Sequence, residues 1–599
     1  MAIDGAGLDA PRRDAAKDRQ GARDAGLWLA AGFWRGRSRS RAWWLSFLLI
    51  AALLINIAIQ YAINEWQGRF FDAIEKHQLD RFVPFVLAFA GLAALSVALG
   101  IAQLVSRMRL QIEWRRWISR ALMTRWLRQR RFYRLGVVAP EVDSPEFRIA
   151  EDARVATEPV VDFAHGFVSA FVTGIVFLGV LWRTGGSATL GGITIPGFMV
   201  WSALIYALMM CGSMWFLARP IITALRGRNA AEAGLRYDMA RVRENAESIA
   251  LLGGGNGEEA HLTLSLDRVI GAWRVVMRQQ ARLCLLTSTN WVASPVVPLL
   301  LMAPHYMTGA ATLGNLVQCA AAFGQVQFAL TWFVDNTPRI GEWLASVSRV
   351  AALSKAMTAL DEGALEGGGI ELGTSPDDRL RLVDLAITQH DGVVMIDNAE
   401  AVFAPGERVW LSGASGIGKS TLVRAVAGLW RWGRGRVLMP AGAEIAFLPQ
   451  RPYMPLGRFR DIVCYPPPVR PPDDATLRSV LARCDLLRFA DQLEVVDRWD
   501  RVLSGGEQQR VGFARLLIAR PDIVIMDEAT SALDVDCQER MMRLFDTELR
   551  GATLISVGHR PELAAYHTRQ IELMRTKRGV HMSEIKAFRG GRVGRMSEA

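Results

Sequence analysis

One stretch of this sequence decides the fold of its second half: Gly413–Ala414–Ser415–Gly416–Ile417–Gly418–Lys419–Ser420–Thr421. It follows the apolar run Val409–Leu411 and precedes a helical pattern that begins at Leu422. A strand, a glycine-rich loop with Lys-Ser and a helix form the context of a phosphate-binding P-loop. In such a loop the backbone N–H groups surround the phosphates, and the positive end of the helix adds to the attraction. We therefore expect Lys419 to contact the β- and γ-phosphates of a nucleotide and Ser420 to hold Mg²⁺.

The composition indicates a membrane part joined to a soluble part. With 599 residues the chain is too long for one domain, and 51% of it is apolar although 22% is charged. Its six cysteines are scattered without a CxxC pair, which predicts a reduced setting with neither a disulfide framework nor a zinc site. The first residues lack the pattern of a cleaved signal peptide.

Six apolar stretches are long enough to cross about 30 Å of hydrocarbon, which requires roughly 20 helical residues. A single stretch of this kind can instead be a buried helix of a soluble core, but six in one chain predict a membrane domain. The predicted spans are Ala42–Ala62, Phe82–Val105, Val160–Trp182, Ile195–Leu217, Leu283–Tyr306 and Leu313–Val334.

The arginines predict the orientation of these spans. They are concentrated before the first span and in the long segments 106–159 and 218–282, whereas the loops near 183–194 and 307–312 are short and nearly uncharged. By the positive-inside rule, both termini and the long loops are cytoplasmic. This placement explains much of the net charge of +11 and leaves no motif that supports nucleic-acid binding.

The order of these signals predicts five regions. Residues 1–41 form a cytoplasmic tail, whose Leu27–Trp34 is an interfacial helix lying on the inner membrane surface. The membrane domain covers 42–360, a glycine-rich linker 361–378, an α/β domain of alternating strands and helices 379–582, and a basic tail 583–599. The fold class is therefore multidomain, with an all-α six-helix membrane domain before an α/β P-loop domain.

Further polar motifs follow the P-loop along the chain. The apolar strand Ile523–Met526 ends in Asp527 and Glu528, which places two carboxylates where α/β sheets bind ligands. Asp527 suits a Mg²⁺ ligand, and Glu528 suits the base that orients the attacking water. The other motif residues are Gln450, Ser504, Gly505, Gly506, Glu507, Asp534 and His559.

These motifs, in this order and spacing, resemble the cassette of ATP-binding cassette (ABC) transporters over about 200 residues. The resemblance implies ATP and Mg²⁺ as cofactors and ATP hydrolysis as the activity. It implies that Ser504–Glu507 cap the ATP held by the P-loop of another cassette and that Asp534 couples the two sites. It also implies that Gln450 contacts Mg²⁺ and the attacking water, and that His559 contacts the γ-phosphate. Because the chain encodes one cassette without an internal repeat, the expected unit is a homodimer.

One feature departs from this family pattern. ABC cassettes usually stack the adenine on an aromatic ring some 25 residues before the P-loop, but residues 370–398 contain no Phe, Tyr or Trp. His390 is the nearest ring, and a neutral His can either stack weakly or lie in a solvent-facing loop. Adenine recognition is therefore left open, and phosphate recognition is not affected.

Six spans before one cassette match the exporter-type ABC fold. Three membrane-domain stretches resemble the bacterial SbmA/BacA-like (YddA-type) group and, more distantly, the peroxisomal fatty-acyl transporters of ABC subfamily D. The stretches are Asn64–Ala73, Glu244–Ala250 and Phe323–Asn336. The bacterial resemblance implies uptake of peptides or other bulky hydrophilic solutes across the bacterial inner membrane. A lipid or fatty-acyl translocase is the alternative, and the spans exclude a soluble ABC ATPase. The direction of transport stays open.

Overall fold

The structure is a computed structural model that divides the chain into two compact units. It describes residues 32–36, 39–139, 142, 144–190, 193–361, 369–389, 392–558, 561–576 and 579–587. The first unit contains Met1–Gln129 and Glu141–Met357, and the second contains Arg130–Pro140 and Thr358–Ala599. The predictions for the tail 1–25, for residues 362–368 of the linker and for His390 and His559 lie outside the described residues.

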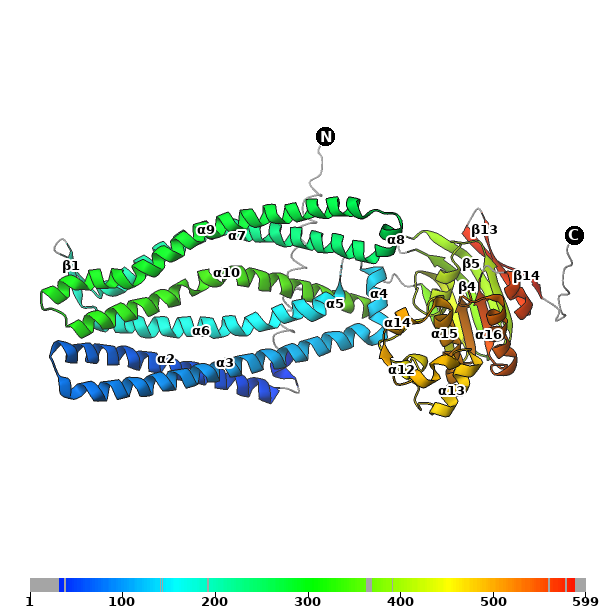
Figure 1. Cartoon of the computed structure of the whole chain (residues 1–599), viewed down its shortest axis with the longest axis horizontal. Helices are drawn as coiled ribbons and strands as arrows, with labels where there is room; N and C mark the ends of the chain where they lie inside the picture. Colours follow the sequence, from blue (N-terminus) through cyan, green and yellow to red (C-terminus); the bar gives the residue numbers. More distant parts are fainter. Residues whose placement is uncertain are drawn as a thin grey trace, which may run out of the picture. The chain divides into compact units, whose positions relative to one another are not determined.

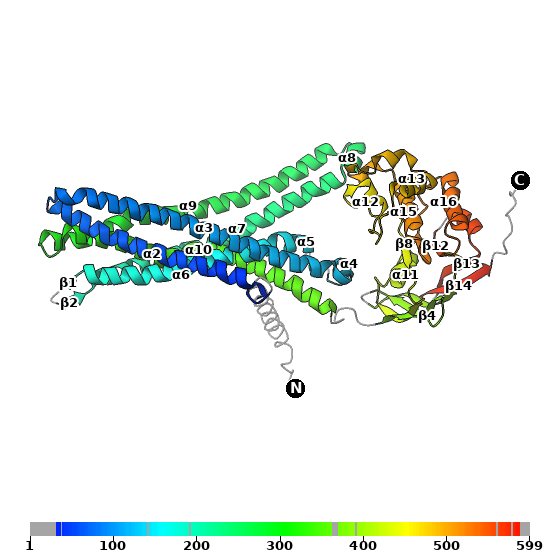
Figure 2. The same cartoon turned by 90° about the horizontal axis from the view of Figure 1, so that it is seen from below.

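Six long helices build the first unit: α2 (Arg39–Glu75), α3 (Phe82–Leu127), α6 (Ala153–Thr184), α7 (Phe198–Glu244), α9 (Gly255–Met307) and α10 (Leu313–Asp361). Each contains an apolar window long enough to cross a membrane. The longest, α9, has 53 residues and therefore extends for about 80 Å, well beyond the hydrocarbon of a bilayer. As Figures 1 and 2 show, α7 and α9 run side by side, and α2 lies along α3.

Short elements connect the long helices of this unit. They are η1 (Leu79–Arg81), η2 (Arg128–Arg130), α5 (Pro145–Phe147), the π-helical η3 (Arg148–Asp152), β1 (Ser187–Leu190), β2 (Ile193–Pro196) and α8 (Ala246–Leu251), whereas α4 (Arg131–Val138) falls within the second unit. The hairpin β1–β2 corrects one predicted boundary. The fourth span was predicted to begin at Ile195, but that residue pairs with Ala188, and the helix begins at Phe198.

Ion pairs and hydrogen bonds join helices of the first unit. Asp152 is almost completely buried and accepts two hydrogen bonds from Arg349 on α10, at 2.8 and 2.6 Å. Asp162 on α6 accepts hydrogen bonds from Gln111 on α3 at 2.8 Å and from Arg339 on α10 at 3.2 Å. Because a buried carboxylate without a partner is costly, these contacts hold α3, α6 and α10 in one arrangement.

A mixed ten-stranded sheet forms the centre of the second unit, in the order β3-β7-β4-β5-β14-β13-β6-β12-β11-β8. Its strands are β3 (Ile370–Thr374), β4 (Leu380–Thr388), β5 (Val394–Phe403), β6 (Arg408–Gly413), β7 (Gly433–Met439), β8 (Ile445–Leu448), β11 (Ile523–Asp527), β12 (Thr553–Val557), β13 (Arg569–Thr576) and β14 (Gly579–Ala587). The neighbours β6, β12, β11 and β8 are parallel, which suits their almost continuous apolar sequences.

The helices of the second unit lie around this sheet. They are α11 (Lys419–Val426), α12 (Phe459–Val463), α13 (Asp474–Arg483), η4 (Leu487–Gln492), α14 (Trp499–Val502), α15 (Gly505–Ala519), α16 (Val535–Thr547) and η5 (Pro561–Tyr566), with a small antiparallel pair of strands, β9 (Gly457–Arg458) and β10 (Val496–Asp497). One apolar core surrounds Phe459, Phe489 and Trp499 among these helices, and a second lines the sheet. Figure 2 shows α12, α13 and α15 gathered on one side of this unit and β4, β13 and β14 on the other.

Two predicted boundaries of this unit differ from the structure. The α/β domain was predicted to begin at 379, but β3 already pairs with β7 from Ile370. It was predicted to end at 582, but β14 continues to Ala587 opposite β13. Both strands lie at the ends of the domain and carry weak apolar patterns, so their pairing is visible only in the sheet.

A buried histidine makes the stability of the second unit depend on pH. The Nδ1 of His567 lies 2.6 Å from the carbonyl oxygen of Leu563, and its Nε2 lies 2.8 Å from the hydroxyl of Ser556. Because a carbonyl only accepts, Nδ1 carries the hydrogen and Nε2 accepts from the Ser556 hydroxyl. Burial lowers the pKa of His567 from 6.5 to about 4, since the charged ring would lose its water.

We predict that His567 destabilises the fold as the pH falls from about 6.5 towards 4. In this window the unfolded chain takes up a proton that the buried ring does not, whereas above it neither state is protonated. At pH 5.5 the loss relative to pH 7.5 should be about 1 kcal/mol, because one pKa step corresponds to about 1.4 kcal/mol. Thermal unfolding of the full chain at both pH values measures this loss.

The His567→Asn variant should show a smaller difference between the two pH values than the wild type. The His581→Asn variant, altered at a half-buried ring near Asp397, serves as the control and should keep the wild-type difference. Equal pH differences in the wild type and His567→Asn would contradict the assignment.

Candidate nucleotide-binding site

The parallel strands bring three of the predicted motifs to one edge of the sheet. Leu411 on β6 pairs with Val557 on β12, and Val557 pairs with Asp527 on β11. Met526 pairs in turn with Leu448 on β8. The four carboxyl ends are thus in register, and the segments that follow them contain the P-loop, Gly558, Glu528 and Gln450. This is the edge at which α/β sheets bind ligands.

The P-loop connects β6 to α11 through backbone that glycine adopts readily. Gly416 has φ +72° and Gly418 has φ +108°, and Gly418 is the residue that caps the N-terminus of α11. A side chain at either position would strain the backbone. The eight-residue helix α11 then begins at Lys419, so its unpaired N–H groups and its positive end lie beside the loop.

The side chain of Lys419 folds back to the start of the P-loop. Its side chain is buried, and its Nζ donates to the carbonyl oxygens of Gly413 at 2.9 Å and Ala414 at 3.0 Å. Burial lowers the pKa of Lys419, and the carboxylates of Glu528 and Asp527 act in the opposite direction. The loop therefore has a cation at its centre, which suits a polyphosphate.

Glu528 and Gln450 are in direct contact. The Nε2 of Gln450 donates to Oε2 of Glu528 at 3.2 Å, although the two residues are 78 positions apart. Glu528 has φ +49°, a left-handed conformation that is uncommon for a residue with a side chain. Its N–H donates to the carbonyl of Val557 at 2.9 Å, which anchors it on β12. Such local strain is typical of functional positions.

The Ser-Gly-Gly-Glu motif lies at the start of α15 rather than at the edge of the sheet. Ser504 and Glu507 form a capping box, in which the Ser504 N–H donates to Glu507 Oε2 at 2.9 Å. The buried Glu507 also contacts Arg488. At Gly506 a Cβ would lie 3.0 Å from the carbonyl oxygen of Ala532, so glycine allows the close approach of the next loop.

Asp534 has a local structural role in this chain. Its Oδ1 accepts a hydrogen bond from the N–H of Cys537 at 2.7 Å and caps α16. The described chain reaches Gly558 at the carboxyl edge of the sheet, immediately before the predicted His559.

The structure adds Gln509, a residue that the motif analysis did not single out. This amide, 2% exposed, donates from Nε2 to the carbonyl of Gln450 at 3.0 Å and to the hydroxyl of Ser531 at 3.2 Å. Its Oε1 accepts from the N–H of Ala532 at 3.0 Å. One side chain thus joins α15, the segment of Gln450 and the loop before Asp534. A polar residue on the buried face of α15 was the available signal.

The residues present fit ATP with Mg²⁺. Among the described residues, no group of three or more His, Cys, Asp or Glu side chains is placed to hold a metal ion. Mg²⁺ needs no such group, because it prefers oxygen ligands and takes several of them from phosphates and water. Ser420, Asp527 and Gln450 supply oxygen donors of this kind.

Two family models match the chain and together cover most of it. The model described as ABC transporter transmembrane region 2 matches residues 33–307, and the model described as ABC transporter matches residues 396–531. The second match includes the P-loop, Gln450, Ser504–Glu507, Asp527 and Glu528.

Three curated relatives are similar over nearly the whole chain. An uncharacterised ABC transporter ATP-binding protein of Synechocystis sp. is 30% identical over 90% of this chain and 82% of its own length. The inner membrane ABC transporter ATP-binding protein YddA of Escherichia coli is 27% identical, with 89% and 94% covered. The human lysosomal cobalamin transporter ABCD4 is 24% identical, with 88% and 91% covered.

A solved structure supports the architecture. A bacterial Atm1-family ABC exporter with ATP bound matches with a TM-score of 0.68 and 18% identity, over 88% of this chain and 93% of the other. At this identity the match concerns the fold alone. It agrees with a six-helix membrane domain followed by an α/β cassette.

We predict that the Gln509→Leu variant loosens the loop that contains Ala532. The substitution removes the hydrogen bonds to the N–H of Ala532 and to the carbonyl of Gln450, each with a net contribution of about 0.5–1.5 kcal/mol. Hydrogen exchange of a peptide covering 529–534 should accelerate about 10- to 100-fold, if local opening governs exchange. Gln508→Leu is the matched control, because Gln508 donates to the carbonyls of Asp500 and Leu503 instead. Unchanged exchange in Gln509→Leu would contradict this role.

Proposed function

Because this chain belongs to the ABC transporter family and is of the half-transporter type, we propose that it hydrolyses ATP to move a solute across the bacterial inner membrane. One observation carries the proposal: a single chain contains six candidate spans and one cassette whose catalytic motifs share a sheet edge. The inner-membrane location is supported by the similarity to YddA of Escherichia coli. The arginine-rich segments support cytoplasmic termini and a cytoplasmic cassette.

In the proposed reaction, residues 413–421 bind the phosphates of ATP through backbone N–H groups and Lys419. Mg²⁺, held by Ser420, Asp527 and Gln450, would neutralise charge on the phosphates. Glu528 would accept a proton from the attacking water, and the hydrogen bond from Gln450 would orient its carboxylate. The resemblance to the family adds a contact of His559 with the γ-phosphate.

The proposed unit is a homodimer. In the family, Ser504–Glu507 of one cassette complete the ATP site of another, and this chain encodes one cassette. The start of α15 supports the idea physically, because the first N–H groups of a helix attract an anion. Gly505 and Gly506, at the first two helical positions, have no side chain of their own to cover these groups.

We propose a bulky hydrophilic compound or a peptide as the transported solute. The similarity to a lysosomal cobalamin transporter supports this class, because cobalamin is large and hydrophilic. Uptake of labelled cobalamin, a peptide and an acyl-CoA into right-side-out and inside-out vesicles tests solute class and direction together. Accumulation of the acyl-CoA alone would overturn the proposed solute class.

We predict that Glu528→Gln lowers ATP turnover about 10²- to 10⁴-fold, the usual contribution of a general base. The amide keeps the size of the side chain but cannot take the proton of the water. Phosphate release by the full chain in proteoliposomes measures turnover, and a fluorescent ATP analogue should still bind. Glu562→Gln, an exposed acid on η5, is the control and should behave as the wild type. Normal turnover in Glu528→Gln would exclude Glu528 as the base.

A further inference from the structure

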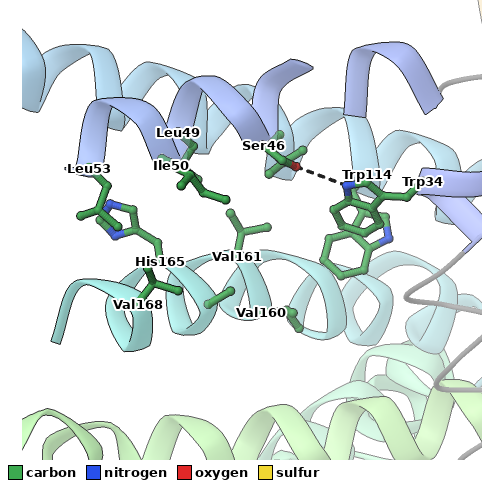
Figure 3. Close-up of a pocket in the computed structure, with 12 residues that line it drawn as sticks. Trp34, Ser46, Leu49, Ile50, Leu53, Trp114, Val160, Val161, His165 and Val168 are labelled. Carbon is green, nitrogen blue, oxygen red and sulfur yellow. Dashed lines mark hydrogen bonds between the residues drawn. The ribbon is translucent and has the colours of Figure 1, made fainter. Parts of the chain in front are cut away.

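A cavity of about 160 Å³ lies between the N-terminal residues 32–36 and the helices α2, α3 and α6. Figure 3 shows Trp34 and Trp114 at one end of this cavity and Leu53 and His165 at the other. Trp34 is held by a hydrogen bond from its Nε1 to the hydroxyl of Ser46 at 3.2 Å and by edge contact with Trp114. Ser46 and His165 are the polar residues of a lining that is otherwise apolar.

The size of the cavity suits part of a hydrocarbon chain. An apolar cavity of about 150 Å³ in a protein core can accept a molecule of benzene, so 160 Å³ accommodates several carbon atoms. The cavity is open to the surface of the helices, where its lining residues Ile50 and Ala164 are exposed. Both residues lie on candidate membrane spans, so the groups that meet this opening are lipid chains.

The cavity lies at the depth of one membrane leaflet. Ser46 and Leu53 are seven and fourteen residues beyond Arg39 along α2, which corresponds to about 10 and 21 Å. At 100° per residue, Arg39, Ser46, Ile50 and Leu53 share one face of this helix. Arg39 therefore lies on the face of α2 that lines the cavity, one to two turns before the first lining residue of this helix. With the orientation proposed above, this is the cytoplasmic leaflet.

The segment of the chain at this end of the cavity is positively charged. Residues 25–64 contain no Asp or Glu but contain Arg35, Arg37, Arg39 and Arg41. Arg35 and Arg39 are exposed, and within the described ranges neither makes an ion pair. Arginine at a membrane surface attracts anionic lipids and binds phosphate oxygens through paired N–H groups.

We propose that this cavity is a binding site for an anionic phospholipid of the cytoplasmic leaflet. One acyl chain enters between α2 and α6, and the phosphate lies against Arg35 and Arg39. The bound lipid holds residues 32–36 against α2 and α6, since Trp34 forms one wall. The inference rests on the proposed orientation of the membrane domain and is independent of ATP hydrolysis.

Native mass spectrometry of the full chain, purified in detergent and mixed with equal amounts of phosphatidylglycerol and phosphatidylcholine of identical chains, tests the site. One phosphatidylglycerol per chain should be retained in preference to phosphatidylcholine. Arg39→Gln should weaken this retention about fivefold, as expected for one charge near a membrane surface. Arg41→Gln is the matched control, because Arg41 lies on the opposite face of α2 at nearly the same depth.

A second pair of variants tests the acyl part of the site. Ala164→Phe should fill the cavity and abolish selective retention, whereas Ala98→Phe, at an exposed position of α3 outside the lining, should not. Equal retention of both lipids by the wild type, or unchanged retention in Ala164→Phe, would overturn the proposal. So would complete displacement of the lipid by excess inorganic phosphate, which would indicate a phosphate site without the chain.

The same assay separates this site from transport. If ATP releases the lipid from the wild type but not from Glu528→Gln, the lipid is cargo and the proposed resident site is wrong. Retention in both proteins supports the site. If Glu528→Gln hydrolyses ATP normally and phosphatidylglycerol is still retained selectively, Glu528 is not the general base. The proposed lipid site is then unaffected.

Discussion

The register of four parallel strands is the constraint on which the cassette depends. β6, β12 and β11 are paired so that Leu411, Val557 and Asp527 lie at corresponding depths, and Leu448 at the end of β8 pairs with Met526, one residue earlier. A shift of one residue would turn each side chain to the other face of the sheet and would part the P-loop from Glu528. These continuous apolar sequences suit the interior strands β6, β12 and β11, which are almost completely buried.

Hydrogen bonds of single side chains then connect this edge to the helical part of the cassette. Gln450 contacts Glu528, and Gln509 holds the carbonyl of Gln450 together with the loop Ser531–Ala532. Since Gln509 belongs to the helix that begins with the Ser-Gly-Gly-Glu motif, movement of α15 is linked to the position of Gln450. The hydrogen bonds of Gln450 and Gln509 all form only in one arrangement of these segments. This favours discrete positions of α15 over its gradual displacement.

The membrane unit is stabilised by other interactions than the cassette. Its apolar surface faces lipid, so ion pairs and hydrogen bonds between helices contribute much of the specificity. Asp152 with Arg349 and Asp162 with Gln111 and Arg339 are contacts of this kind, and they join helices that are far apart in sequence. Arg35 and Arg39, exposed and without an ion pair among the described residues, differ from these pairs, as the proposed contact with a lipid headgroup requires.

The sequence by itself determined the local chemistry of this protein. Apolar length predicted all six spans, and glycine spacing with Lys419 predicted the phosphate loop, because both depend on neighbouring residues. It did not locate β3, β14 or the start of α7 correctly, since those boundaries depend on strand pairing: β3 pairs with the distant β7, β14 with β13 and β5, and β2, just before α7, with β1. Nor did it single out Gln509. A glutamine on a helix is common, and its structural role is recognised only once its side chain is seen to be buried. The contact of Gln450 with Glu528 and the cavity beside Trp34 were decided by tertiary structure, because each is formed by residues from separate segments of the chain.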